Sequence, residues 1–288
     1  MSANRTTPPE VVTFDFWDTL VQAPTAVETR HARRDRLHAA LGARGVAVDQ
    51  AHLDHALAEI RRAFDEHWAA NRQFSGVDAT GVLLRDLGAD LAPADAAAVA
   101  DAFMGIGDPH LPALTHNIEA TLRSLQANGV RLGIICDVGL SPSTVLRSYL
   151  ERHGVLDAFD HWSFSDEVGV YKPDARIFEH ALRGLGGVDP GRAAHVGDLR
   201  RTDIAGAQAF GMTAVRYAGS NDDRVPDGPP PGEGDAAMVA EAGVPGAGGS
   251  GGSSGGSGGS MAPSAAHAPE GDAVIHDHAD LLSALGFP

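Results

Sequence analysis

Short apolar runs alternate with segments of helical pattern along most of this chain, and that alternation restricts the fold. The runs are nearly continuous in apolar character and cover residues 11–14, 132–135, 162–164, 194–196 and 213–215. Helical patterns cover residues 144–152, 174–185 and 203–210. Apolar strands separated by helices pair in parallel and are covered by helices on both faces. The sequence therefore predicts an α/β fold built on a doubly wound parallel sheet.

A different pattern fills residues 21–115, between the first two predicted strands. Apolar side chains recur there at the three- and four-residue spacing of amphipathic helices: Leu37, Leu41, Leu53, Leu57, Ile60, Phe64 and Trp68. Gly42, Gly45 and residues 88–93 divide the block into several helices. Since residues 115–128 suffice as the crossover to the second strand, we expect the block to form a cap over the ligand edge of the sheet.

Residues 219–272 are rich in glycine, proline, alanine and serine, and 246–260 contain only glycine, serine and one alanine. Such a stretch cannot bury enough apolar surface to become ordered, so we predict a flexible insertion or linker, either native or engineered. Residues 273–275 and the leucines after them predict a last strand and a short helix. The predicted organisation is a core of residues 1–20, 116–218 and 273–288, a helical cap of 21–115, and a flexible segment of 219–272.

Composition restricts the compartment and the partners. Cys136 is the single cysteine, so neither an intrachain disulfide nor a thiolate zinc site can form, and we expect a reducing, cytoplasmic setting. No apolar run approaches the roughly 18 residues needed to cross a membrane, and residues 1–10 lack the apolar centre of a signal peptide. A formal net charge of -16 disfavours nucleic acid and anionic lipid. We expect a monomer or homodimer that acts on a small molecule.

Acidic side chains follow three of the predicted strands at the points where those strands end. Asp15 follows the first strand, Asp137 the second and Asp198 a later one, with Asp203 five residues further on. Ligands of open parallel sheets bind at this edge. Carboxylates gathered there repel each other unless a hard cation lies among them, and Mg²⁺ prefers oxygen ligands. Lys172, the only lysine among 22 lysine and arginine residues, adds a compact positive charge. Together these residues predict a phosphate-handling site.

Four short motifs, taken in order, resemble those of the haloacid dehalogenase-like (HAD) superfamily. They are Phe14-Asp15-x-x-x-Thr19-Leu20, Cys136-Asp137, Lys172-Pro173 and Gly197-Asp198-x-x-x-x-Asp203. The resemblance covers nearly the whole chain apart from the predicted flexible segment, and the helical block lies where that superfamily places a C1-type cap. It implies a Rossmann-like α/β core with an inserted all-helical cap. The implied activity is that of a Mg²⁺-dependent phosphatase with a small phosphorylated substrate.

The same resemblance implies roles for individual residues. Asp15 is the implied nucleophile, and its aspartyl phosphate would split one difficult displacement into two easier ones. Thr19 would lie near the phosphate-binding loop, and Lys172 would accompany the nucleophile and the phosphoryl group. The implied Mg²⁺ site consists of Asp15, the backbone carbonyl of Trp17, Asp198 and Asp203, the last either ligating the ion or orienting the site from a helix start.

Two positions depart from the family's pattern. The family's phosphatases carry an Asp two residues after the nucleophile as general acid and base, whereas Trp17 stands here and either shapes the substrate pocket or fills core space. General acid–base help is worth about 10²–10⁴-fold. Cys136-Asp137 replaces the family's Ser or Thr followed by Asn, so a weak thiol donor or a small buried residue stands at a phosphate-binding position. We hypothesise that Asp137 supplies the missing acid–base function.

Other activities are compatible with parts of this pattern. The family's dehalogenases carry an aromatic residue, Tyr, at the position of Trp17 and work without metal, but they lack the paired acids that Asp198 and Asp203 provide here. Phosphonate cleavage needs a cap lysine, and residues 21–115 contain none. A catalytically weakened phosphate-binding or interaction module is the non-enzymatic alternative.

Two further clusters are interpreted as surface features. Arg200 and Arg201 fit a solvated helix face better than a substrate clamp. The sequence His276-Asp277-His278 fits a solvated helix start better than a metal-binding pair.

Overall fold

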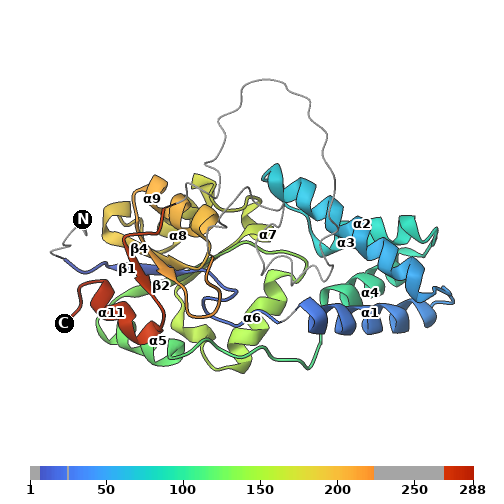
Figure 1. Cartoon of the computed structure of the whole chain (residues 1–288), viewed down its shortest axis with the longest axis horizontal. Helices are drawn as coiled ribbons and strands as arrows, with labels where there is room; N and C mark the ends of the chain where they lie inside the picture. Colours follow the sequence, from blue (N-terminus) through green and yellow to red (C-terminus); the bar gives the residue numbers. More distant parts are fainter. Residues whose placement is uncertain (1–6, 25, 224–268) are drawn as a thin grey trace, which may run out of the picture.

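The structure is a computed structural model that describes residues 7–24, 26–223 and 269–288. Its centre is a six-stranded parallel sheet (Figure 1). The strands are β1 (Val11–Phe14), β2 (Arg131–Cys136), β3 (His161–Phe164), β4 (Ala193–Gly197), β5 (Thr213–Tyr217) and β6 (Ala273–Ile275). Each strand expected from an apolar run is therefore present, and the α/β class predicted from the alternation is confirmed.

The strands lie in the order β3-β2-β1-β4-β5-β6. The central strand β1 pairs with β2 on one side and β4 on the other, and Val12 lies opposite both Leu132 and Ala194. The chain thus winds outward from β1 in two opposite directions, which is the doubly wound topology. Ligands of such sheets bind beyond the carboxyl ends of the strands, where the order reverses. The reversal in this sheet lies between β1 and β4.

Both faces of the sheet are covered by helices because its strands are apolar on both sides. Val12 and Phe14 of β1 point into a hydrophobic cluster shared with α5 (Ile118–Ala127), α6 (Ser143–Arg152) and α11 (Leu281–Ala284). Val11 points to the opposite face, into a second cluster shared with other helices. Those helices are α8 (Ala175–Gly184) and α9 (Ala205–Phe210), and the short α7 (Ser165–Val168) precedes them.

Four helices lie between β1 and α5 in the sequence, beside the sheet in Figure 1. They are α1 (Ala26–Gly42), α2 (Gln50–Ala69), α3 (Gly76–Asp86) and α4 (Pro93–Met104). The periodic apolar residues of α1 and α2, such as Leu37 and Leu53, enter a third hydrophobic cluster with side chains of α3 and α4. This helical unit therefore has a core of its own, which includes Leu140 from the segment after β2.

The C-terminal segment closes one edge of the sheet, with β6 pairing beside β5. The interpretation of His276-Asp277-His278 as a solvated helix start is wrong for His278, which is fully buried. Its ring stacks on Tyr217, with centroids 4.0 Å apart, and its Nε2 lies 2.8 Å from the carbonyl oxygen of Thr19. Asp277 does begin the turn, since its side chain accepts a hydrogen bond from the backbone of Ala279.

Most of the segment predicted to be flexible, residues 219–272, falls outside the described residues, which include only 219–223 and 269–272 of it. Within the part of the chain that the structure describes, no helix combines the length and apolar character needed to cross a membrane.

Candidate active site

The first carboxylate of the site continues the central strand. The backbone amide of Asp15 donates to the carbonyl of Val196 at 2.8 Å, so the chain is still in register with β4 when it reaches the carboxyl edge of the sheet. Asp18, three residues later, has a φ of 53°, and its side chain accepts a hydrogen bond from the backbone of Ala23. This turn carries the chain away from the sheet and leaves Asp15 at the edge.

The only lysine of the chain lies against two of the carboxylates. Lys172 is 3% exposed; its Nζ contacts Asp15 Oδ1 and lies 2.6 Å from Asp203 Oδ1 and 3.0 Å from the carbonyl oxygen of Ile135. Burial alone would lower the pKa of Lys172, but Asp15 and Asp203 raise it well above its usual range. The two carboxylates therefore favour the charged form of this buried side chain.

Three carboxylates converge at this edge. Asp15, Asp198 and Asp203 each place an oxygen within 4.8 Å of the others, and all three residues are buried. Burial raises the pKa of Asp15 to about 7 against the opposing effect of Lys172. Burial and the charges of Asp203 and Asp15 raise the pKa of Asp198 well above its usual range. One lysine thus does not balance the negative charge that the three groups carry when ionised.

Asp203 differs from the other two carboxylates because, among the described residues, both of its oxygens meet donors of the protein. Its Oδ1 meets Lys172 and the Nε2 of His195, the latter at 3.1 Å, and its Oδ2 accepts the backbone amide of Leu199 at 2.9 Å. Burial would raise its pKa, but Lys172 and His195 hold the pKa of Asp203 at about 2. Gly197 permits this approach, since a Cβ there would lie 2.3 Å from Asp203 Cγ.

His195 was not singled out from the sequence as part of the site. It is fully buried on β4, and its Nδ1 lies 2.9 Å from the hydroxyl oxygen of Thr13 on β1. Thr13 and His195 thus support Asp203 from within the sheet. The available signal was a titratable residue in the middle of an otherwise apolar strand.

Asp137 lies beside the lysine on a neighbouring strand end. Its Oδ1 accepts the backbone amide of Lys172 at 2.8 Å. Burial raises the pKa of Asp137 to about 7, although Lys172 acts in the opposite direction. The preceding Cys136 is 1% exposed and belongs to the main hydrophobic cluster. The carboxyl group of Asp137 can therefore change protonation state near neutral pH.

The two remaining predicted residues follow Asp15 in the chain. Trp17 is 7% exposed and belongs to the main hydrophobic cluster, with its ring edge-on to Phe16 and Tyr149. The Thr19 hydroxyl is buried and, within the described residues, has no hydrogen-bond partner. Trp17 therefore fills core space, and Thr19 keeps an unsatisfied hydroxyl two residues later.

The connection between α2 and α3 lies directly on the chain segments that carry Asp137 and Lys172. Gln73 Nε2 donates to the carbonyl of Val138 at 3.1 Å. Tyr171 donates its amide to Asn71 Oδ1 at 2.9 Å, and its hydroxyl accepts the amide of Phe74 at 3.1 Å. The helical unit is thus held against residues adjacent to two site residues.

The interpretation of Arg200 and Arg201 as a solvated helix face is wrong. Both lie on a π-helical turn, Arg200–Ile204, that precedes α9. The Arg200 side chain is buried and paired with Glu270. The guanidinium of Arg201 stacks on the ring of Trp68 from α2, with its carbon 3.7 Å from the ring centroid. Each arginine is therefore used in a tertiary contact.

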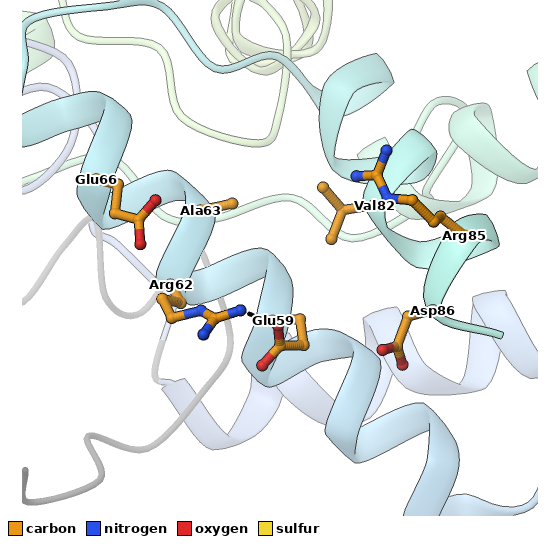
Figure 2. Close-up of a pocket in the computed structure, with 7 residues that line it drawn as sticks. All are labelled: Glu59, Arg62, Ala63, Glu66, Val82, Arg85 and Asp86. Carbon is orange, nitrogen blue, oxygen red and sulfur yellow. Dashed lines mark hydrogen bonds and ion pairs between the residues drawn. The ribbon is translucent and has the colours of Figure 1, made fainter.

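A surface cavity of about 470 Å³ lies between α2 and α3, away from these carboxylates. Figure 2 shows its lining, which combines residues of α2 with residues of α3: Glu59, Arg62, Ala63, Glu66, Val82, Arg85 and Asp86. Its lining contains both acidic and basic side chains, and Arg62 is paired with Glu59. None of the residues at the carboxyl edge of the sheet contributes to this cavity.

Comparison with known proteins identifies the class. The haloacid dehalogenase-like hydrolase family matches residues 9–211, a range that includes every residue of the carboxylate cluster. The chain therefore belongs to the haloacid dehalogenase-like hydrolases and is an enzyme of that family. This confirms the resemblance inferred from the four motifs.

Individual relatives fall into both phosphatase and dehalogenase groups. A glyceraldehyde 3-phosphate phosphatase of Methanopyrus kandleri is 32% identical over 76% of this chain and 91% of its own length. A haloacid dehalogenase-like hydrolase domain-containing protein 3 of Bos taurus is 28% identical over 73% and 82%. The crystal structure of a 2-haloacid dehalogenase from Pseudomonas syringae is similar with a TM-score of 0.62 and 25% identity, covering 96% of this chain and 98% of that one.

The raised pKa of Asp137 predicts a pH-dependent stability difference between the wild-type chain and Asp137→Asn. The folded state holds the Asp137 proton up to about pH 7, whereas the unfolded chain releases it near pH 3.8. This contribution of the Asp to folding is present below about pH 4 and is lost as the pH rises to about 7. The melting temperature of the Asn variant should therefore rise relative to wild type across that interval and level off above it. A melting-temperature difference between the two proteins that does not change with pH would contradict the raised pKa of Asp137.

Proposed function

We propose that this protein is a Mg²⁺-dependent phosphatase that removes phosphate from a small phosphomonoester through a covalent intermediate on Asp15. The observation that carries the proposal is the buried group of Asp15, Asp198 and Asp203 with the ammonium of Lys172 among them. The match to a phosphatase along nearly its whole length supports the same reaction class.

The donor set fits a hard divalent cation. Burial, together with neighbouring carboxylates, raises the pKa values of Asp15 and Asp198, and a bound cation would stabilise their ionised forms. Carboxylate oxygens are the ligands that Mg²⁺ prefers. Asp15, Asp198 and the backbone carbonyl of Trp17 would hold the ion, and Asp203 would orient the site through Lys172, because its oxygens already meet protein donors. A bound Mg²⁺ would neutralise charge that develops on the phosphoryl oxygens.

Asp15 is the proposed nucleophile. One of its carboxylate oxygens would attack phosphorus, forming an aspartyl phosphate as the bond from phosphorus to the leaving oxygen breaks. Lys172 fixes the other oxygen and supplies positive charge beside the transferring group. Water would then attack the phosphorus of the intermediate, which releases phosphate and restores the Asp15 carboxylate.

Asp137 is the proposed general acid and base in place of the residue at position 17. Its pKa of about 7 allows the protonated carboxyl to donate to the leaving alcohol in the first step. The resulting carboxylate can then accept a proton from the attacking water in the second step. Asp137 accepts the backbone amide of Lys172, whose ammonium contacts Asp15, so both carboxyl groups surround the same lysine.

The helices α1–α4 are proposed to form the cap. This assignment keeps the boundaries inferred from the sequence, with residues 21–115 as the cap and the flanking segments as the core. The contacts of Asn71, Gln73 and Phe74 next to Asp137 and Lys172 support this assignment. A cap in that position would exclude water and select the leaving group. We place the enzyme in the cytoplasm as a monomer or homodimer.

Replacing the nucleophile separates the phosphatase from the alternatives. We expect Asp15→Asn to reduce Mg²⁺-dependent phosphate release from an aryl phosphate by more than about 10³-fold, because the covalent route is lost. The matched control is Asp157→Asn, which changes an exposed carboxylate and should keep wild-type activity. Metal-independent halide release from 2-haloacids would favour the dehalogenase instead. No turnover in either assay would favour the phosphate-binding module.

Replacing the proposed acid–base group tests its role in turnover. We expect Asp137→Asn to lower kcat by about 10²–10⁴-fold. The loss should be greater for an alkyl than for an aryl phosphate, since alkoxide leaving groups need a proton more. The alkaline limb of kcat/KM, which reflects the pKa of about 7, should disappear in the variant. If Asp137→Asn retains full turnover on both substrates, Asp137 has no acid–base role.

A further inference from the structure

The carboxylate of Asp198 is held by a residue from a distant part of the chain. Asn221, which follows β5, donates from its side-chain amide to Asp198 Oδ2 at 3.0 Å. Asp198 is 1% exposed, so the orientation of its carboxylate depends on protein contacts more than on water. An amide that fixes one carboxylate oxygen determines the direction in which the other is presented to a ligand.

The residues after Asn221 are fixed by two buried arginines. Asp222 Oδ1 lies 3.0 Å from the guanidinium of Arg216 on β5. Asp223 accepts the backbone amide of Arg200 at 2.8 Å and the Arg200 guanidinium on its own backbone carbonyl. Because Arg200 follows Asp198 by two residues, the same contacts connect the segment of Asn221 to the loop of Asp198.

Glu270, which precedes β6, joins the two arginines. Its carboxylate contacts Arg200 and lies 3.0 Å from Arg216 Nη2. Arg200 and Arg216 are 6% and 5% exposed, and buried guanidinium groups require such partners to offset the loss of hydration. We define Arg200, Arg216, Asp222, Asp223 and Glu270 as the arginine cluster. It holds Asn221 from two independent strand ends.

We propose that Asn221 is a positioning residue for the divalent-cation ligand Asp198, and that the arginine cluster sets the cation affinity of the site by fixing Asn221. This inference rests on the proposed function, since it assigns Asp198 as a ligand of Mg²⁺. It extends that function by assigning a role to Asn221, which lies outside the four motifs and within residues 219–272, the segment predicted to be flexible.

The test is a calorimetric titration of the metal-free full-length protein with MgCl₂, which measures the Kd for Mg²⁺. Asn221→Ala should raise the Kd for Mg²⁺ roughly 10–100-fold, the usual effect of removing a group that orients a metal ligand. The KM for an aryl phosphate at saturating Mg²⁺ should stay near wild type, because Asn221 is proposed to act on Asp198 and not on the substrate. A merely structural role would not separate these two constants.

Two variants complete the design. Asn128→Ala is the matched control, since Asn128 is an exposed asparagine whose side chain donates to the Ser124 carbonyl far from the site, and its Kd should equal that of wild type. Glu270→Gln, at a side chain that is 58% exposed, should raise the Kd in the same direction and by less, even if Asn221→Ala fails to fold.

The outcomes are distinguishable. If Asn221→Ala folds and its Kd for Mg²⁺ is unchanged, this inference is overturned and the proposed function still stands. If Asn221→Ala does not fold, an unchanged Kd for Mg²⁺ in Glu270→Gln has the same meaning. If the wild-type protein takes up no Mg²⁺, the proposed function and this inference fail together.

Discussion

The rest of the site depends on one buried ammonium group. Lys172 is 3% exposed and lies between Asp15 at the end of β1 and Asp203 after β4, while its own backbone amide fixes Asp137 after β2. Taking charges out of water is costly unless they are paired with good geometry. The pairing therefore requires three separate strand ends to keep their relative positions. A doubly wound sheet provides that arrangement because the carboxyl ends of its parallel strands meet at one edge.

The electrostatics of the site follow from an imbalance between that lysine and the surrounding acids. Asp203, held by Lys172 and His195, has a pKa of about 2 and remains ionised. Asp15 and Asp137 have pKa values of about 7 because burial outweighs their lysine contact. Groups with separated pKa values in one site can serve different purposes, and here Asp203 stays the ionised partner of Lys172 while Asp15 and Asp137 change protonation state near neutral pH. The difference in pKa among chemically identical side chains thus comes from their surroundings.

The fold and the convergence of Asp15, Asp198 and Asp203 at one sheet edge were predictable because both depend on local sequence. Apolar runs fix the strands, and an acid directly after a strand, such as Asp15, must lie at the sheet edge. The roles of His195 and Asn221 depend instead on tertiary contacts, with Asp203 in one case and Asp198 in the other. The charge of Arg200 favoured an exposed position, but the side chain is buried and paired with Glu270, seventy positions later in the chain. Trp17 could not be assigned to core or pocket until its packing against Tyr149 was known.

The central claim is that Asp15, held by Lys172, receives a phosphoryl group from the substrate. It is tested most directly by mixing excess enzyme and Mg²⁺ with an aryl phosphate, quenching a single turnover in acid, and mapping the peptides by mass spectrometry. We expect one phosphoryl group on the peptide that contains Asp15, and none on that peptide when Asp15→Asn is treated in the same way. Release of phosphate in that turnover without any phosphoryl group on the Asp15 peptide, across all quench times, would contradict it.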